Sequence, residues 1–184
     1  MKNNSLRNWL AILGGLFWIT WHLYYIFSRI DYREIGASIL LAALSVFLMA
    51  SSVYSLVRGQ YLGIAGKISA GFLIFCILLW FLGASLYGLN IWQSGWFLVI
   101  GGEVLTTLGL AAFSLGALMD EPRTLWKWLP LFLAPIYFIS FSTTSDSFPT
   151  WMPEYTPEWF AVAYGLGWML FGFLLPRKVG ASSV

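Results

Sequence analysis

Residues 96–119, WFLVIGGEVLTTLGLAAFSLGALM, form a run of 24 residues in which Glu103 is the only charged side chain. An α-helix rises 1.5 Å per residue, so about 20 mostly apolar residues cross the roughly 30 Å hydrocarbon core of a bilayer. The run is continuous and does not alternate, which favours a helix over a strand of a membrane barrel. Residues 96–119 therefore predict a transmembrane helix.

Five further runs of the same kind lie at 9–27, 35–57, 68–88, 126–142 and 158–176. Backbone groups in lipid must pair internally, as they do in a helix. The run at 126–142 is the shortest, and Pro135 inside it is expected to kink the helix. The longest connection, 143–157, is too short for a soluble domain. We therefore predict an all-α integral membrane bundle of six transmembrane helices with short loops, forming one domain over residues 1–184.

The composition excludes other classes of protein. Of the 184 residues, 59% are hydrophobic and only 10% are charged, against roughly 25% charged in typical soluble domains. Disorder requires low hydrophobicity, and a disulfide scaffold requires more than the lone Cys76. A net charge of +2 is too small to indicate nucleic acid as a partner. The partner that remains is the lipid bilayer.

The basic residues predict the orientation of the bundle. Eight of the ten Lys and Arg residues lie in the N-terminal segment, the second and fourth connections and the C-terminal tail, which share one side if there are six spans. These eight are Lys2, Arg7, Arg58, Lys67, Arg123, Lys127, Arg177 and Lys178. The opposite side holds only Arg29 and Arg33. Because Lys and Arg accumulate on the cytoplasmic side, both termini are expected to be cytoplasmic.

Aromatic residues flank the predicted spans. Trp and Tyr favour the headgroup region, so these positions predict an interfacial belt. The flanking residues are Trp9, Tyr32, Tyr54, Tyr61, Tyr87, Trp92, Trp96, Trp126, Trp128 and Trp159. The connection 143–157 contains three prolines and several aromatics, and it suits either an interfacial anchor or a lid over the outer half of the bundle.

Glycines recur every seven residues through the run at 96–119. An ideal helix drifts only about 20° per heptad, so they form one nearly straight stripe. The stripe comprises Gly95, Gly102, Gly109 and Gly116, and the same spacing recurs at Gly165 and Gly172 in the run at 158–176. Small residues mark helix contacts in membranes. We predict that these two helices pack on each other or that one forms a dimer face; a glycine-lined substrate path is the functional alternative.

Two ionisable side chains lie deep within the predicted spans, His22 and Glu103. His22 is roughly 7–8 Å and Glu103 roughly 10 Å from the outer end of its helix. Tyr137 and Tyr164 reach similar depths, and Thr106 and Thr107 lie one turn below Glu103. One interpretation is a polar pocket in which Glu103 and His22 share a proton or hold a ligand. The other is that Glu103 hydrogen-bonds between helices as structural glue, with His22 capped by a carbonyl or reaching the headgroups.

Catalytic motifs are absent from the sequence. One His and one Cys cannot form a structural zinc site or a bis-histidine haem site within the chain. The sequence also lacks G-x-S-x-G, H-E-x-x-H and C-x-x-C. The glycine-rich segment RGQYLGIAGK at 58–67 joins two membrane helices and follows no strand, so it predicts a tight cytoplasmic turn, with a lipid-headgroup contact as the alternative. No metal or cofactor is expected.

At the 58–67 loop and the ending Pro176, Arg177 and Lys178, the chain resembles the small bacterial multi-pass membrane proteins that have no assigned activity. The resemblance implies a bacterial cytoplasmic membrane. The favoured function is non-enzymatic binding of a lipid-like or small amphiphilic ligand in the outer-half polar pocket. The alternatives are an accessory or assembly subunit, supported by the glycine stripes and acting as a homo-oligomer or with a membrane partner, and a small proton-coupled permease. An intramembrane enzyme is the least favoured.

Overall fold

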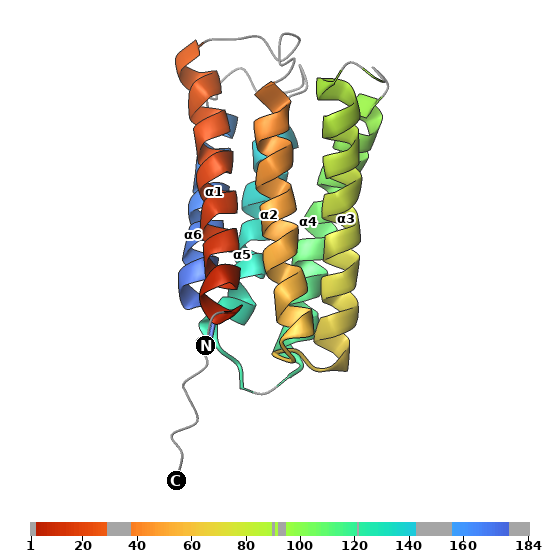
Figure 1. Cartoon of the computed structure of the whole chain (residues 1–184), viewed down its shortest axis with the longest axis vertical. Helices are drawn as coiled ribbons and strands as arrows, with labels where there is room; N and C mark the ends of the chain where they lie inside the picture. The colour runs from red at the N-terminus through yellow and green to blue at the C-terminus, as the bar shows by residue number, and fades with distance from the viewer. Residues whose placement is uncertain are drawn as a thin grey trace.

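The computed structural model describes residues 3–28, 38–89, 91, 95–120, 122–142 and 156–176. This part of the chain is all-α, as predicted, with six helices in an up-and-down order (Figure 1). They are α1 (Asn3–Ser28), α2 (Ile39–Arg58), α3 (Ile64–Gly88), α4 (Gly95–Leu118), α5 (Leu125–Ser142) and α6 (Thr156–Leu174). Helix α5 continues through both Pro130 and Pro135. Most of the 143–157 connection lies outside the described residues.

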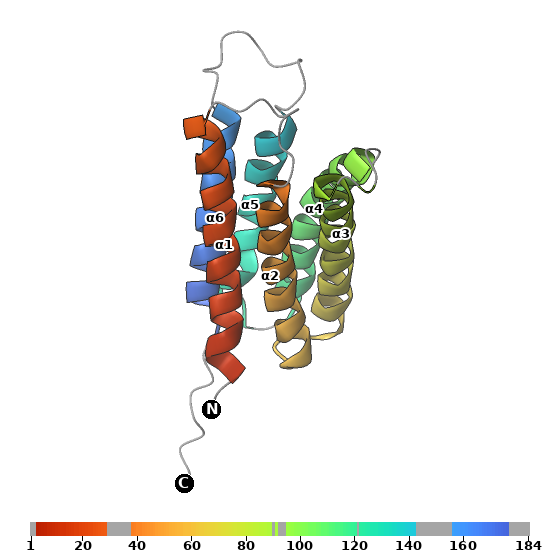
Figure 2. The ribbon, with the colours of Figure 1, turned by 45° about the horizontal axis from the view of Figure 1, so that its top comes forward.

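The helices form a closed ring. Each one packs on its neighbours along the chain, and α6 returns to pack on α1. Figures 1 and 2 show α1, α2 and α3 as one layer, with α6, α5 and α4 behind them. Short connections between antiparallel neighbours produce this arrangement. The ring gives every helix one side that faces a shared interior and one that faces outward.

Four helices in the described part of the chain are long and apolar enough to cross a membrane, which confirms a multi-pass character by length and composition. The qualifying segments are Leu6–Ser28, Ile39–Arg58, Ile64–Gly88 and Phe97–Leu118. The apolar parts of α5 and α6, Leu125–Ser140 and Glu158–Leu174, are shorter. Six complete crossings therefore remain a prediction.

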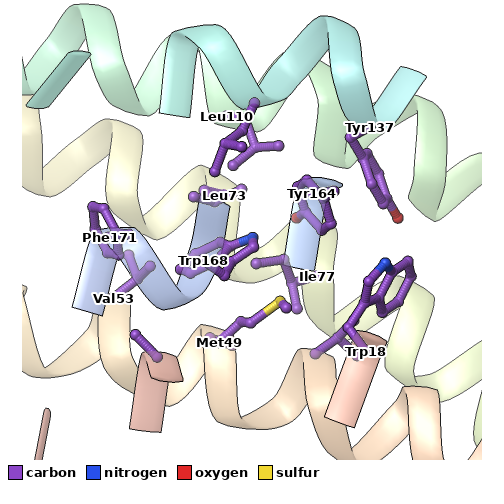
Figure 3. Close-up of a cluster of buried hydrophobic side chains, with 14 of the residues drawn as sticks. Trp18, Met49, Val53, Leu73, Ile77, Leu110, Tyr137, Tyr164, Trp168 and Phe171 are labelled. Atoms are coloured by element: carbon purple, nitrogen blue, oxygen red, sulfur yellow. The ribbon is translucent and has the colours of Figure 1, made fainter. Parts of the chain in front are cut away.

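Both surfaces of the ring are apolar. Large side chains fill the interior, and Figure 3 shows Phe171 and Val53 at one end of this core and Trp18 and Tyr137 at the other. Outside, Phe27, Phe97 and many similar residues are exposed. A continuous apolar exterior is unfavourable in water and suits lipid contact.

The glycine stripe of α4 packs on α3. A Cβ at Gly102 would lie 2.7 Å from the backbone nitrogen of Trp80, and one at Gly109 would lie 3.1 Å from the Cα of Leu73. Gly95 and Gly116 also face α3. The close approach that small residues permit is therefore present, but the predicted pairing of this helix with 158–176 is wrong, because α3 occupies the stripe.

The glycines of α6 face α1. A Cβ at Gly165 would lie 2.8 Å from the carbonyl oxygen of Gly15, and one at Gly172 would lie 2.7 Å from the carbonyl oxygen of Asn8. The two stripes thus hold two separate antiparallel pairs, α3 with α4 and α1 with α6.

The 58–67 loop forms the predicted tight turn. Gln60 adopts a positive φ of 59°, and Gly63 precedes α3. The backbone N–H of Gly63 donates to Oδ2 of Asp120 at 2.6 Å, which joins this turn to the end of α4. A Cβ at Gly63 would lie 2.1 Å from Oδ1 of the same carboxylate, so a larger residue would displace the carboxylate that accepts this hydrogen bond. Asp120 places a negative charge at the N-terminus of α3, where the helix dipole favours it.

Two of the basic residues used to predict orientation are buried at this end. Arg7 lies over the ring of Tyr61, 4.3 Å from its centroid, and its guanidinium donates to the carbonyl oxygen of Pro176. The ammonium group of Lys127 donates to the backbone carbonyl of Asp120 at 2.6 Å. Buried polar groups need such partners. The contacts of Arg7 tie the start of α1 to the end of α6 and to the 58–67 loop, and the contact of Lys127 closes the connection between α4 and α5.

The aromatic belt is only partly as predicted. Trp9, Tyr54, Trp128 and Trp159 are exposed near helix ends. Trp126 is 4% exposed and packs on Phe171 inside the ring, at 6.1 Å between centroids, so the prediction is wrong for it. Trp126 lies in the first turn of α5, where an interfacial residue is expected, but the helix is rotated so that this side chain faces the interior of the ring of helices. The side chains of Tyr32, Trp92 and Trp96 lie outside the described residues.

Candidate functional site

Trp18 lies at the centre of an aromatic cluster inside the ring. Its ring centroid is 5.7 Å from Trp80 of α3, 6.0 Å from Tyr137 of α5 and 5.7 Å from Tyr164 of α6. Tyr137 and Tyr164 also pack on each other at 4.5 Å. These separations are typical of favourable aromatic pairs. One side chain of α1 therefore contacts three other helices in a single layer.

Glu103 joins α4 to this layer through Trp80. The indole nitrogen of Trp80 donates to Oε1 of Glu103 at 3.2 Å. Thr107 does not reach the cluster by hydrogen bonding, because its hydroxyl donates to the carbonyl oxygen of Glu103 in its own helix, at 3.1 Å. Thr106 is 3% exposed, and its hydroxyl has no hydrogen-bond partner among the described residues.

His22 lies on another side of Trp18, one helical turn further along α1. Its ring centroid is 5.0 Å from Trp18 and 4.6 Å from Trp21, and the residue is only 6% exposed. Within the described part of the chain, neither ring nitrogen of His22 has a hydrogen-bond partner. The same holds for the indole nitrogens of Trp18 and Trp21. Three neighbouring rings thus present unpaired polar atoms in a buried environment.

The packing of α1 on α6 places His22 at a narrow helix contact. Gly165 of α6 lies against both Gly15 and Ile19 of α1. The helices are antiparallel, so one turn beyond Ile19 on α1 corresponds to one turn before Gly165 on α6. His22 is therefore level with Ala161, which is fully buried.

The structure brings together part of the predicted site. Tyr137 and Tyr164 share the cluster around Trp18, and Glu103 joins it through Trp80. His22 and Glu103 are not hydrogen-bonded to each other, because both imidazole nitrogens are unpaired. Two tryptophans connect the two ionisable residues: the ring of His22 contacts Trp18, and Trp18 contacts Trp80. The indole nitrogen of Trp80 donates to Glu103.

Sequence reasoning missed the three tryptophans that organise the site. Trp18, Trp21 and Trp80 lie within the predicted spans and away from their ends. An interfacial belt does not explain a tryptophan at that depth. The depth of these tryptophans in the sequence was therefore the signal that could have identified them.

The arrangement suits binding. Indole nitrogens only donate hydrogen bonds, and an imidazole can donate and accept, so the three unpaired rings can hold an oxygen-bearing group. Among the described residues, no group of three His, Cys, Asp or Glu side chains is placed to hold a metal ion. Comparison of the chain with family models, with curated proteins and with solved structures finds no match.

Proposed function

We propose that this multi-pass membrane protein binds a small amphiphilic ligand, without chemical conversion, in the aromatic layer around Trp18. One observation carries the proposal: among the described residues, neither ring nitrogen of the buried His22 has a hydrogen-bond partner. The two tryptophans in ring contact with it have indole nitrogens that lack one as well. Almost all buried polar groups in folded proteins have a partner. A polar ligand group at this position would supply the missing one.

The lipid-like character of the ligand follows from the surroundings of His22. Trp18, Tyr137 and Tyr164 provide large apolar ring surfaces, and the exterior of the bundle is apolar as well. Binding sites for small molecules typically combine apolar walls with a few placed polar groups. A molecule with an apolar body and one polar end matches that combination.

A proton-coupled permease has less support. Such a path needs polar groups that continue from Glu103 to the other end of the ring, and the hydroxyl of Ser114 donates to the backbone carbonyl of Lys127. Phe113, Phe171 and Trp126 fill the interior at that level. The accessory-subunit alternative also loses its main argument, because the glycines that suggested an external interface serve the internal α3–α4 and α1–α6 contacts.

The proposal includes the location of the protein. We place it in a bacterial cytoplasmic membrane with six crossings, both termini cytoplasmic and the His22 layer in the outer half. The excess of Lys and Arg at the opposite end of the ring supports this orientation.

The test of ligand binding is to purify the protein in mild detergent and identify the lipids that remain bound. A preparation of His22→Ala and one of Trp9→Phe should be analysed in parallel. Trp9 is 57% exposed and lies near the opposite end of α1, so its variant is the matched control. We expect one amphiphile to be enriched with the wild type and the control and depleted with His22→Ala. Equal lipid profiles for all three proteins would contradict the proposal.

A further inference from the structure

We infer that the polar end of the ligand is an uncharged group with carbonyl-type acceptor oxygens, held by the side chains of Trp18, Trp21 and His22. This inference rests on the proposed function and adds the chemical class of the ligand. It follows from which atoms are unpaired and from the charges around them.

The unpaired atoms are mainly donors. The indole nitrogens of Trp18 and Trp21 each offer one N–H and no acceptor, and His22 adds a donor on one of its two nitrogens. The rings of these residues are in mutual contact, with centroids 5.8 Å apart for Trp18 and Trp21. Clustered donors call for acceptor oxygens. A cationic headgroup has no acceptor atom, whether or not it has donors. It would therefore leave the indole N–H groups unpaired.

The charges around the site disfavour an anion. Within the described residues, His22 forms no hydrogen bond to an acidic or basic group, and its neighbours are the rings of Trp18 and Trp21. The carboxyl group of Glu103 would repel an anion when ionised and would not compensate its charge when protonated. An imidazolium at His22 would pair with an anion, but only by burying two charges among the rings of Trp18 and Trp21. A buried charge without a partner is strongly unfavourable. An uncharged acceptor pairs the donors without this cost.

Two kinds of membrane molecule carry such a group. The carbonyl oxygens of an isoprenoid quinone lie on a flat ring, which suits contact with aromatic side chains. The ester carbonyls of a diacylglycerol lie at the head of two acyl chains. Both share the chemistry inferred here, and the experiment separates them.

Four probes should be added to the delipidated protein in detergent: decylubiquinone, dioctanoylglycerol, oleate and dodecyl phosphate. Binding is measured by the shift of the unfolding temperature and by quenching of tryptophan fluorescence. We expect a saturable response to decylubiquinone or to dioctanoylglycerol, and none to the two anionic probes. A response to oleate or dodecyl phosphate alone would overturn the inferred class while preserving amphiphile binding. No response to any probe would overturn the proposed function itself.

Variants of His22 connect the response to this site. His22→Phe keeps a ring among the indoles and removes both nitrogens, so we expect at least a tenfold weaker affinity for the uncharged probe. His22→Gln keeps a donor and an acceptor and should retain more affinity than His22→Phe. The unfolding temperature without any probe reports whether each variant folds. Equal affinity of wild type and a folded His22→Phe protein would overturn the inference.

Discussion

At the scale of single residues, His22 is kept at a cost to stability. A buried group without a hydrogen-bond partner costs about 1–3 kcal/mol. In the part of the chain that the structure describes, its two nitrogens have no hydrogen-bond partner, and its ring lies against Trp18 and Trp21. Such costs persist in proteins mainly at functional positions.

His22→Leu should therefore raise the free energy of unfolding of the ligand-free protein by about 1 kcal/mol, because it removes the unpaired polar atoms. The measurement is thermal or denaturant unfolding in detergent after removal of lipid. His22→Asn, which keeps polar atoms in the layer, is the control and should give no gain. A His22→Leu protein less stable than the wild type would mean that the imidazole is a satisfied structural group.

Glu103 has a different role, since it is paired. The indole N–H of Trp80 donates to its carboxyl group. Glu103→Leu leaves that indole without an acceptor and should lower the free energy of unfolding by about 1–3 kcal/mol. Glu103→Gln keeps an acceptor oxygen and should be close to the wild type in the same unfolding measurement. If both variants were equally destabilised, a charge on Glu103, and not its hydrogen bond, would be the stabilising feature.

The sequence predicted that these residues share one level of the bundle, but it did not predict their partners. Counting residues along each helix placed His22, Glu103, Tyr137 and Tyr164 in one layer, because the rise per residue is constant. The same counting does not predict that Trp18 lies between them. Helices that are apolar on all sides carry no pattern that fixes their rotation, so the facing residues follow only from packing.

At the scale of helices, the contact between α3 and α4 depends on Gly102. A Cβ there would meet the backbone nitrogen and Cα of Trp80 at 2.7 and 2.8 Å, and a backbone cannot move aside as a side chain can. Gly102→Ala should force the helices apart and destabilise the protein by about 1–3 kcal/mol.

Gly101 provides the matched control for Gly102. It is the preceding residue of the same helix, and a Cβ there has no neighbour within 4 Å. Gly101→Ala should be neutral or stabilising, by up to about 1 kcal/mol, because alanine favours a helix over glycine. Comparing the free energies of unfolding of the two variants separates the effect of the close helix contact from the effect of helix propensity. Similar effects of the two substitutions would contradict the close contact.

The partners of the two glycine-rich helices, α4 and α6, were not predictable from the sequence pattern. A glycine every seventh residue correctly indicated a close-packed face on α4 and on α6. It did not indicate which helix occupies each face. The ring order selects the partner, since α3 precedes α4 with a short connection and α6 closes on α1. A stripe of small residues predicts that another helix can approach closely, but it does not predict which of the neighbouring helices does so.

At the scale of the whole molecule, Asp120 joins two turns at one end of the ring. Its carboxylate accepts the N–H of Gly63, and this bond also favours the start of α3. A hydrogen bond to a charged group contributes about 1.5–3 kcal/mol. Asp120→Ala should lower the free energy of unfolding by about 2 kcal/mol, whereas Arg123→Ala, an exposed position nearby, should change it little. A neutral Asp120→Ala would show that the turns hold together without this bond.

The ring also relates the two ends of the chain to the membrane. Arg7 near the start of α1 contacts Pro176 just after α6, so the chain enters and leaves the bundle at the same end. That end also holds the turns with Arg58, Lys67, Arg123 and Lys127, and such an excess of basic residues is retained in the cytoplasm. The opposite turn between α3 and α4, which contains Ile91, should then face outward.

Single cysteines test this orientation in intact cells. Cys76 is fully buried and would be replaced by serine, after which Ile91→Cys and Arg123→Cys introduce one thiol each at exposed positions of opposite turns. A membrane-impermeant maleimide should label residue 91 in intact cells and residue 123 only after lysis. The reverse pattern would invert the bundle and move the His22 layer to the cytoplasmic half. A ligand would then reach His22 from inside the cell, so this experiment also determines from which side the proposed amphiphile enters.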